Sequence, residues 1–179
     1  MQNFLKFSIV FLCAFILSAC AATSQPPIPS GQRINLEKNS DGFQYSEIVN
    51  QTGTAKELYD SALVWVTRNY VSANDVIQLN DRENNQLIVK GSFTGSYITS
   101  KIWIPHTLEI RTKDGRYQIR YNNFRYTNTP IDNGISFLDA FNNSGISEKS
   151  IVSQAEDSIS RSLIDLKSYM ASAKEEANW

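Results

Sequence analysis

Three residues limit most of the chemistry that this sequence can perform: the cysteines Cys13 and Cys20, and the single histidine, His106. Because both cysteines lie among the first 20 residues, the rest of the chain can form no disulfide, thiol nucleophile or cysteine-ligated zinc site. One histidine cannot supply a paired-histidine zinc site, and no serine lies in the G-x-S-x-G motif of hydrolases. We therefore predict a structural His106 and no catalytic residues, metal site or cofactor.

The first 20 residues have the pattern of a bacterial export signal. Lys6 is their only charged residue, and the apolar run 7–17 is too short to span a membrane comfortably. The sequence LSAC at 17–20 resembles the bacterial lipobox, which has an aliphatic residue, two small residues and a cysteine. The resemblance implies cleavage between Ala19 and Cys20, followed by attachment of a diacylglyceryl group and an N-linked acyl chain, such as palmitate, to Cys20.

Acylation of this kind would anchor the mature chain in a bilayer, because each buried CH₂ contributes ~0.8 kcal/mol. We therefore expect a signal peptide at 1–19 and a membrane-anchored lipoprotein of the cell envelope. Ala21 is not the aspartate that retains many lipoproteins in the inner membrane, so by resemblance the periplasmic face of the outer membrane is favoured. A general secretory signal with a chance cysteine and a Gram-positive host are the alternatives.

The segment 20–42 is predicted to be the lipidated cysteine and a flexible tether. It is rich in proline, glycine and small polar residues, which disfavour helices and central strands. The alternative is that part of the segment packs along the domain as an extra edge.

The rest of the chain, 43–179, is predicted to be one domain. Alternating apolar residues begin at Phe43, and Thr54 and Glu57 have the spacing of a capping box before a helical apolar stripe. A longer connection, rich in asparagine and glycine, precedes the last helix. The expected elements are strands near 43–48, 76–79, 87–93, 102–110 and 116–121, with helices at 55–71 and about 147–173.

Asp114 and Gly115 predict a type I′ hairpin turn, because both residue types tolerate positive φ. A two-residue loop would place Ile110 opposite Ile119, and Glu109 opposite Arg120 on the other face. After the turn, the apolar residues fall on odd-numbered positions up to Tyr121 and on even-numbered positions from Phe124 onward. This shift predicts a bulge near 122–123.

The predicted fold class is α+β, with element order β-α-β-β-β-β-α. An antiparallel sheet of about five strands with both helices on one face would bury both apolar stripes. The opposite sheet face is predicted to be polar, and it would carry Thr107, Glu109, Arg111, Gln118 and Arg120.

The segment 43–126 resembles a bacterial domain-of-unknown-function family with a TATA-box-binding-protein-like (TBP-like) fold. The resemblance is carried by FQYSEIV, GTAKELYDSALVWV and NDRENNQLIVKGSF, in that order along the chain. It implies the fold and supplies no known catalytic residues. It implies no nucleic-acid binding, because the net charge is −1 and lysine and arginine are scattered along the sequence.

Four apolar residues are candidate contacts for a partner or ligand: Trp103, on the polar parity of its strand, and Phe137, Leu138 and Phe141, in the connection before the last helix. The leading functional hypothesis is a non-catalytic binding or assembly module with an envelope protein as partner. The alternative is a carrier or sensor of a small amphiphile, bound between the sheet and the C-terminal helix. A hydrolase is least expected, since it would depend on His106.

Overall fold

The computed structural model describes residues 26–70, 76–130 and 134–176, with the side chains of 174–176 left out. These residues form a six-stranded antiparallel sheet of order β1-β2-β6-β5-β4-β3, a two-stranded sheet β7-β8 and three helices. The fold is therefore α+β, as predicted. The elements are β1 Glu37–Asn39, β2 Gly42–Asn50, α1 Ala55–Asn69, β3 Ile77–Asp81, β4 Gln86–Tyr97, β5 Ser100–Lys113, β6 Arg116–Asn122, β7 Arg125–Tyr126, β8 Ile135–Ser136, α3 Phe137–Asn143 and α4 Glu148–Glu176.

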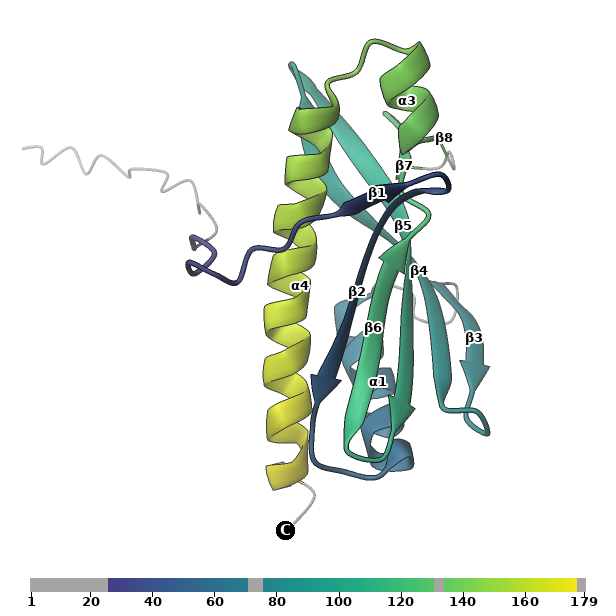
Figure 1. Cartoon of the computed structure of the whole chain (residues 1–179), viewed down its shortest axis with the longest axis vertical. Helices are drawn as coiled ribbons and strands as arrows, with labels where there is room; N and C mark the ends of the chain where they lie inside the picture. Colours follow the sequence, from purple (N-terminus) through teal and green to yellow (C-terminus); the bar gives the residue numbers. More distant parts are fainter. Residues whose placement is uncertain (1–25, 71–75, 131–133, 177–179) are drawn as a thin grey trace, which may run out of the picture.

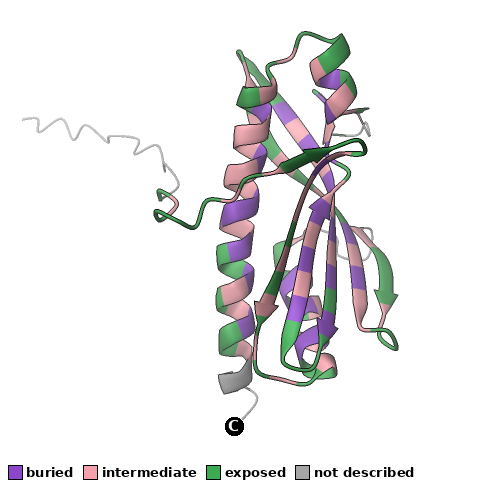
Figure 2. Cartoon of the chain, in the orientation of Figure 1, coloured by how far each residue is buried: buried purple, intermediate pink, exposed green. Residues whose placement is uncertain are grey.

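Helices α1 and α4 lie on the same face of the sheet, and α4 runs along its length (Figure 1). Buried positions alternate along the strands (Figure 2), and they join the buried residues of α1 and α4 in one core cluster. Trp65 joins the two helices, because its Nε1 donates to Asp165 Oδ2 at 2.6 Å. The predicted arrangement of two helices on one face is confirmed.

The predicted capping box starts α1. Thr54 Oγ1 accepts from the backbone N of Glu57 at 3.3 Å, and Glu57 Oε2 accepts from the backbone N of Thr54 at 2.8 Å. Two backbone donors that the helix itself cannot satisfy are thereby paired.

The β5–β6 hairpin has the predicted register, with Ile110 opposite Ile119 and Glu109 opposite Arg120. The predicted type I′ turn is wrong, because Gly115 has φ +77° whereas Asp114 does not have a positive φ. Asp114 instead serves α1: its Oδ1 accepts from the backbone N of Ala55 at 2.7 Å. The conformation of the turn therefore depends on the contact between Asp114 and Ala55 as well as on the turn residues themselves.

The predicted bulge follows β6. Three residues of β5 separate Trp103 from Thr107, whereas four residues separate their partners, Thr127 and Asn122. Asn123 lies within this extra length and has φ +54°, which a bulge tolerates. The chain therefore continues along β5 after the bulge.

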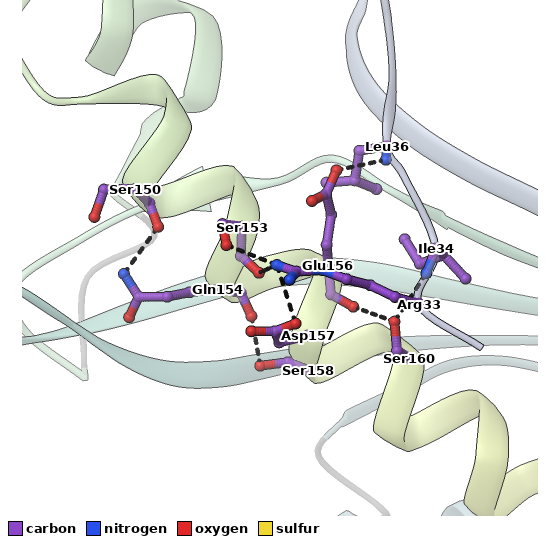
Figure 3. A network of polar contacts seen from close by, with 10 residues as sticks. All are labelled: Arg33, Ile34, Leu36, Ser150, Ser153, Gln154, Glu156, Asp157, Ser158 and Ser160. Atoms are coloured by element: carbon purple, nitrogen blue, oxygen red, sulfur yellow. Dashed lines mark hydrogen bonds and ion pairs between the residues drawn. The ribbon is translucent and has the colours of Figure 1, made fainter. Parts of the chain in front are cut away.

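The prediction of a flexible tether at 20–42 does not hold for its second half. Leu36 N donates to Glu156 Oε1 at 3.0 Å, and Ile34 N donates to Ser160 Oγ at 3.1 Å, both on α4 (Figure 3). Glu37–Asn39 then pairs with β2 as an edge strand. The alternative prediction, that part of the segment packs as an extra edge, is correct for these residues. Side chains of α4 accept from the backbone N–H groups of Ile34 and Leu36, and β2 pairs with Glu37–Asn39.

The connection at 127–146 contains a short helix, α3, which was not among the elements predicted from the sequence. Ser136 Oγ caps it by accepting from the backbone N of Asp139 at 3.1 Å. At seven residues, α3 is too short for a clear helical periodicity in the sequence.

Candidate functional site

The face of the sheet that points away from α1 and α4 is here called the open face. Because side chains alternate along a strand, it carries the residues of β4, β5 and β6 that lie between the buried ones. All six basic residues of these strands fall on this face, and five of them are exposed, Arg120 being half-buried. They are Lys90, Lys101, Arg111, Lys113, Arg116 and Arg120.

Glu109 is the only acidic residue of these three strands, and it lies in the middle of the open face. Arg111 Nη2 lies 2.5 Å from Glu109 Oε1, and Arg120 Nη1 lies 3.7 Å from Glu109 Oε2. Gln86 Nε2 also donates to Glu109 Oε1 at 2.7 Å. A single carboxylate thus serves two guanidinium groups.

The remaining cations have no acidic partner among the described residues. Lys90, Lys113 and Arg116 are exposed and form no ion pair in the part of the chain that the structure covers. Lys101 Nζ lies 5.2 Å from the ring centroid of Trp103, in a cation–π arrangement. The basic residues are scattered along the sequence, but strand alternation gathers six of them on this face.

Trp103 lies on the open face, as its parity predicts, opposite Thr94 of β4. Its backbone pairs with Thr127, with N–O distances of 2.9 and 3.2 Å, so that the chain after β7 borders it. The side chain remains half-buried beside Lys101. Trp103 thus combines an aromatic surface with a neighbouring positive charge.

The other three predicted contact residues belong to α3. Phe137 is only 1% exposed and packs against Phe43, Phe124 and Phe141, with ring centroids 5.9, 5.6 and 5.1 Å apart. Leu138 and Phe141 are half-buried. The structure therefore places Phe137 within the core, and leaves Leu138 and Phe141 at its edge.

A hollow of about 1110 Å³ reaches from the aromatic residues beneath the helices to the edge of the open face. The residues that line it include Trp65, Phe93, Trp103 and Leu138. Three of the four predicted contact residues, Trp103, Phe137 and Leu138, thus line one hollow.

His106 lies on the helix-covered face and is 3% exposed. Its ring stacks on Phe93 with centroids 4.0 Å apart, and its Nδ1 lies 3.1 Å from the backbone O of Ile104. Burial lowers the pKa of His106 to about 4, against the weaker opposing effect of the Ile104 carbonyl. The imidazole is therefore neutral at pH 7, and its buried Nε2 has no hydrogen-bond partner among the described residues.

Gly91 explains how the histidine fits. A Cβ at this position would lie 2.5 Å from Tyr70 Cε1 and 2.7 Å from His106 Nε2. Both rings therefore occupy space that only glycine leaves free. His106 and Tyr70 close the sheet against α1 at this point.

Ala19 and Cys20, the predicted cleavage and lipidation residues, lie outside the described residues. Of the helices in the described ranges, none combines the length and the apolar character needed to cross a bilayer. Within the same ranges, no three His, Cys, Asp or Glu side chains are grouped as metal ligands would be.

Comparison with known proteins places the domain by its fold. Residues 45–127 match a family model described as a domain of unknown function (DUF4468) with TBP-like fold. A TBP-like protein from Parabacteroides distasonis has 16% identity and a TM-score of 0.60, over 74% of this chain and 94% of that one. A DUF4468 family protein from Bacteroides ovatus has 12% identity and a TM-score of 0.52, over 80% and 92%. No curated protein matches the chain. At these identities, the structural likeness shows a shared fold.

Proposed function

Because residues 45–127 match the model of a domain of unknown function (DUF4468) with TBP-like fold, we propose a function from the surface of that domain and the N-terminal motif. The protein is a lipid-anchored, non-catalytic binding module of the bacterial cell envelope, and its open face contacts the partner. The single observation that supports this most is the gathering of six basic residues on the open face of β4, β5 and β6, where Glu109 is the only acidic residue of these three strands.

The anchor rests on the lipobox-like sequence at 17–20, with Cys20 as the acylated residue and the outer membrane favoured by Ala21. The described chain reaches Pro26, whose backbone O accepts from Arg161 Nη1 of α4 at 2.5 Å. Six residues span at most about 22 Å, so an acylated Cys20 would hold the α4 side towards the membrane. The open face would then point away from the bilayer.

A binding role fits the residues of the open face better than catalysis does. The one carboxylate that β4, β5 and β6 place there is already paired with two arginines, and the chain's only histidine is neutral and buried on the opposite side of the sheet. General acid–base catalysis needs a titratable group that can reach the substrate. The open face instead offers fixed positive charges, hydroxyl groups and one tryptophan, which suit recognition.

Two experiments test the parts of this proposal separately. Labelling of bacterial cells with radioactive palmitate should mark the wild-type chain and leave Cys20→Ala unlabelled. A photo-crosslinking residue at Thr94, exposed on the open face, should capture an envelope protein, whereas one at Ser168, exposed on α4, should not. Equal capture from both positions, or capture from neither, would contradict the binding surface proposed here.

The hollow supports a second candidate function, transport or sensing of a small amphiphile. Its volume of about 1110 Å³ is large enough for a ligand, and Trp65, Phe93 and Leu138 provide apolar walls. Native mass spectrometry of the full chain, released gently from detergent, should then show a retained ligand. Leu138→Arg, which places a charge at the wall, should abolish retention, and a wild-type chain free of ligand would exclude this function.

A further inference from the structure

We infer that the open face binds an extended acidic polypeptide, laid along strand β5. This inference rests on the proposed function, since it names the partner class for the same surface. Three features support it: the spacing of the cations, the shortage of acidic partners for them among the described residues, and the position of the proposed anchor.

The cations form a stripe rather than a point. Lys101 lies near one end of β5 and Lys113 at the other, and Lys90 of β4 lies opposite Thr107 between them. At about 3.4 Å per residue, the twelve steps from Lys101 to Lys113 span about 40 Å. A small anion could contact only one part of such a stripe, whereas an extended chain could contact all of it.

The stripe contrasts with the rest of the molecule. The whole chain has a net charge of −1, which becomes −2 when Lys6 is removed with the signal peptide. The open-face side chains of β4, β5 and β6 contribute six positive charges and one negative charge. A partner with negative charge is therefore attracted to this face and repelled elsewhere, which orients its approach.

The same features favour a polypeptide over other polyanions. A membrane is disfavoured because the proposed anchor holds the opposite side of the domain to the bilayer. Single-stranded nucleic acid is usually bound on successive aromatic residues, whereas the open face of β4, β5 and β6 carries only Trp103. Hydroxyl and amide side chains lie between the cations and can hydrogen-bond to peptide groups; they include Ser92, Thr94, Thr107 and Gln118.

The test uses the full chain in detergent micelles and a fluorescent peptide of twelve glutamates, followed by anisotropy. The variant Lys90→Glu/Lys113→Glu should bind this peptide roughly tenfold more weakly than the wild type does. The control Lys56→Glu/Lys149→Glu changes the net charge equally, at exposed residues of α1 and α4, and should lose less than about twofold. Circular dichroism checks that both variants are folded.

Equal losses in the two variants would reduce the effect to net charge and overturn the inference. Tighter binding of twelve-nucleotide single-stranded DNA, or of phosphatidylglycerol vesicles, than of the glutamate peptide would overturn the choice of partner. In either case, crosslinking from Thr94 to an envelope protein could still succeed, so failure here is distinct from failure of the proposed function.

Glu109 provides a gain-of-binding test. Glu109→Gln releases Arg111 and Arg120 from their shared carboxylate and keeps the size of the side chain. The affinity for the glutamate peptide should rise roughly threefold, because two more cations become available. Unchanged or weaker binding would overturn the inference that the peptide crosses the middle of β5.

Discussion

The two faces of strand β5 carry different chemistry within one run of residues. On the helix-covered face, Ile102, Ile104 and Leu108 are fully buried. On the open face, the alternate residues include Lys101, Trp103 and the ion-paired Glu109. A substitution should therefore change mainly stability on one face and mainly binding on the other, even when the two residues are adjacent.

The largest expected effect comes from Leu108→Ala. Leu108 is fully buried, and its truncation should lower the free energy of unfolding by about 2–5 kcal/mol, through lost burial and a residual cavity. Urea denaturation measures the loss. The adjacent open-face variant Thr107→Ala is the matched control and should change stability by less than about 1 kcal/mol. Similar losses for the two variants would show that the faces do not differ as described.

His106 adds a pH dependence to the covered face. Its pKa is about 4 in the folded chain and 6.5 in the unfolded chain, so the unfolded state binds the extra proton between these values. The stabilisation is complete above pH 6.5, falls as the pH falls, and has lost about 3 kcal/mol near pH 4.

The measurement compares the wild type with His106→Phe by urea denaturation at several pH values between 4 and 7. The variant lacks the titrating group, so the difference in unfolding free energy between the two proteins should change across this range. A constant difference would mean that His106 is not held in its neutral form by burial.

The hairpin register was predictable because it depends on local chemistry. The Asp114–Gly115 turn and the alternation of Ile110 and Ile119 fix which residues pair, and the structure has the same pairs. The docking of residues 33–39 was not predictable in the same way. Residues 34 and 36 rely on single polar contacts with α4, more than one hundred residues away, which leave no periodic pattern in the sequence.

The basic open face was hidden by averaging over the chain. The net charge of the chain sums over both faces of the sheet and over all elements. The charge of one face depends instead on which alternate residues of each strand point to it. Lys90 and Lys101 belong to different strands, and the predicted parities together with the β4–β5 hairpin would have placed them on one side. The contribution of α3, by contrast, depends on long-range packing of Phe137 on Phe43, which one sequence does not reveal.

The helix layer is itself partly covered, because residues 33–36 pack on α4. Ser160 is fully buried, accepts from Ile34 N and donates to the backbone O of Glu156 at 2.6 Å. Ser160→Ala should leave the Ile34 N–H without this partner and cost about 1–3 kcal/mol. Hydrogen exchange should show faster exchange at Ile34, whereas Ser168→Ala, exposed on the same helix, should have no such effect.

Glu109 tests how much the open face contributes to stability. Its ion pairs with Arg111 and Arg120 are partly exposed, so screening by solvent reduces their value. Glu109→Gln should lower the free energy of unfolding by about 0.5–1 kcal/mol, and 1 M salt should lessen the difference from the wild type. A loss as large as that of Leu108→Ala would instead mean that the Glu109 carboxylate is as important for stability as a buried core side chain.

The smallest effect on folding is expected at Lys90, and it sharpens the comparison most. Lys90 is exposed and has no ionic partner among the described residues, so Lys90→Gln removes no contact that holds the fold together. The free energy of unfolding should change by less than about 0.5 kcal/mol in urea denaturation. Its neighbour Val89, fully buried on the other face, supplies the contrast, since Val89→Ala should cost several times more. Comparable costs at 89 and 90 would mean that Lys90 supports the fold, and its unpaired charge would then no longer indicate a binding surface.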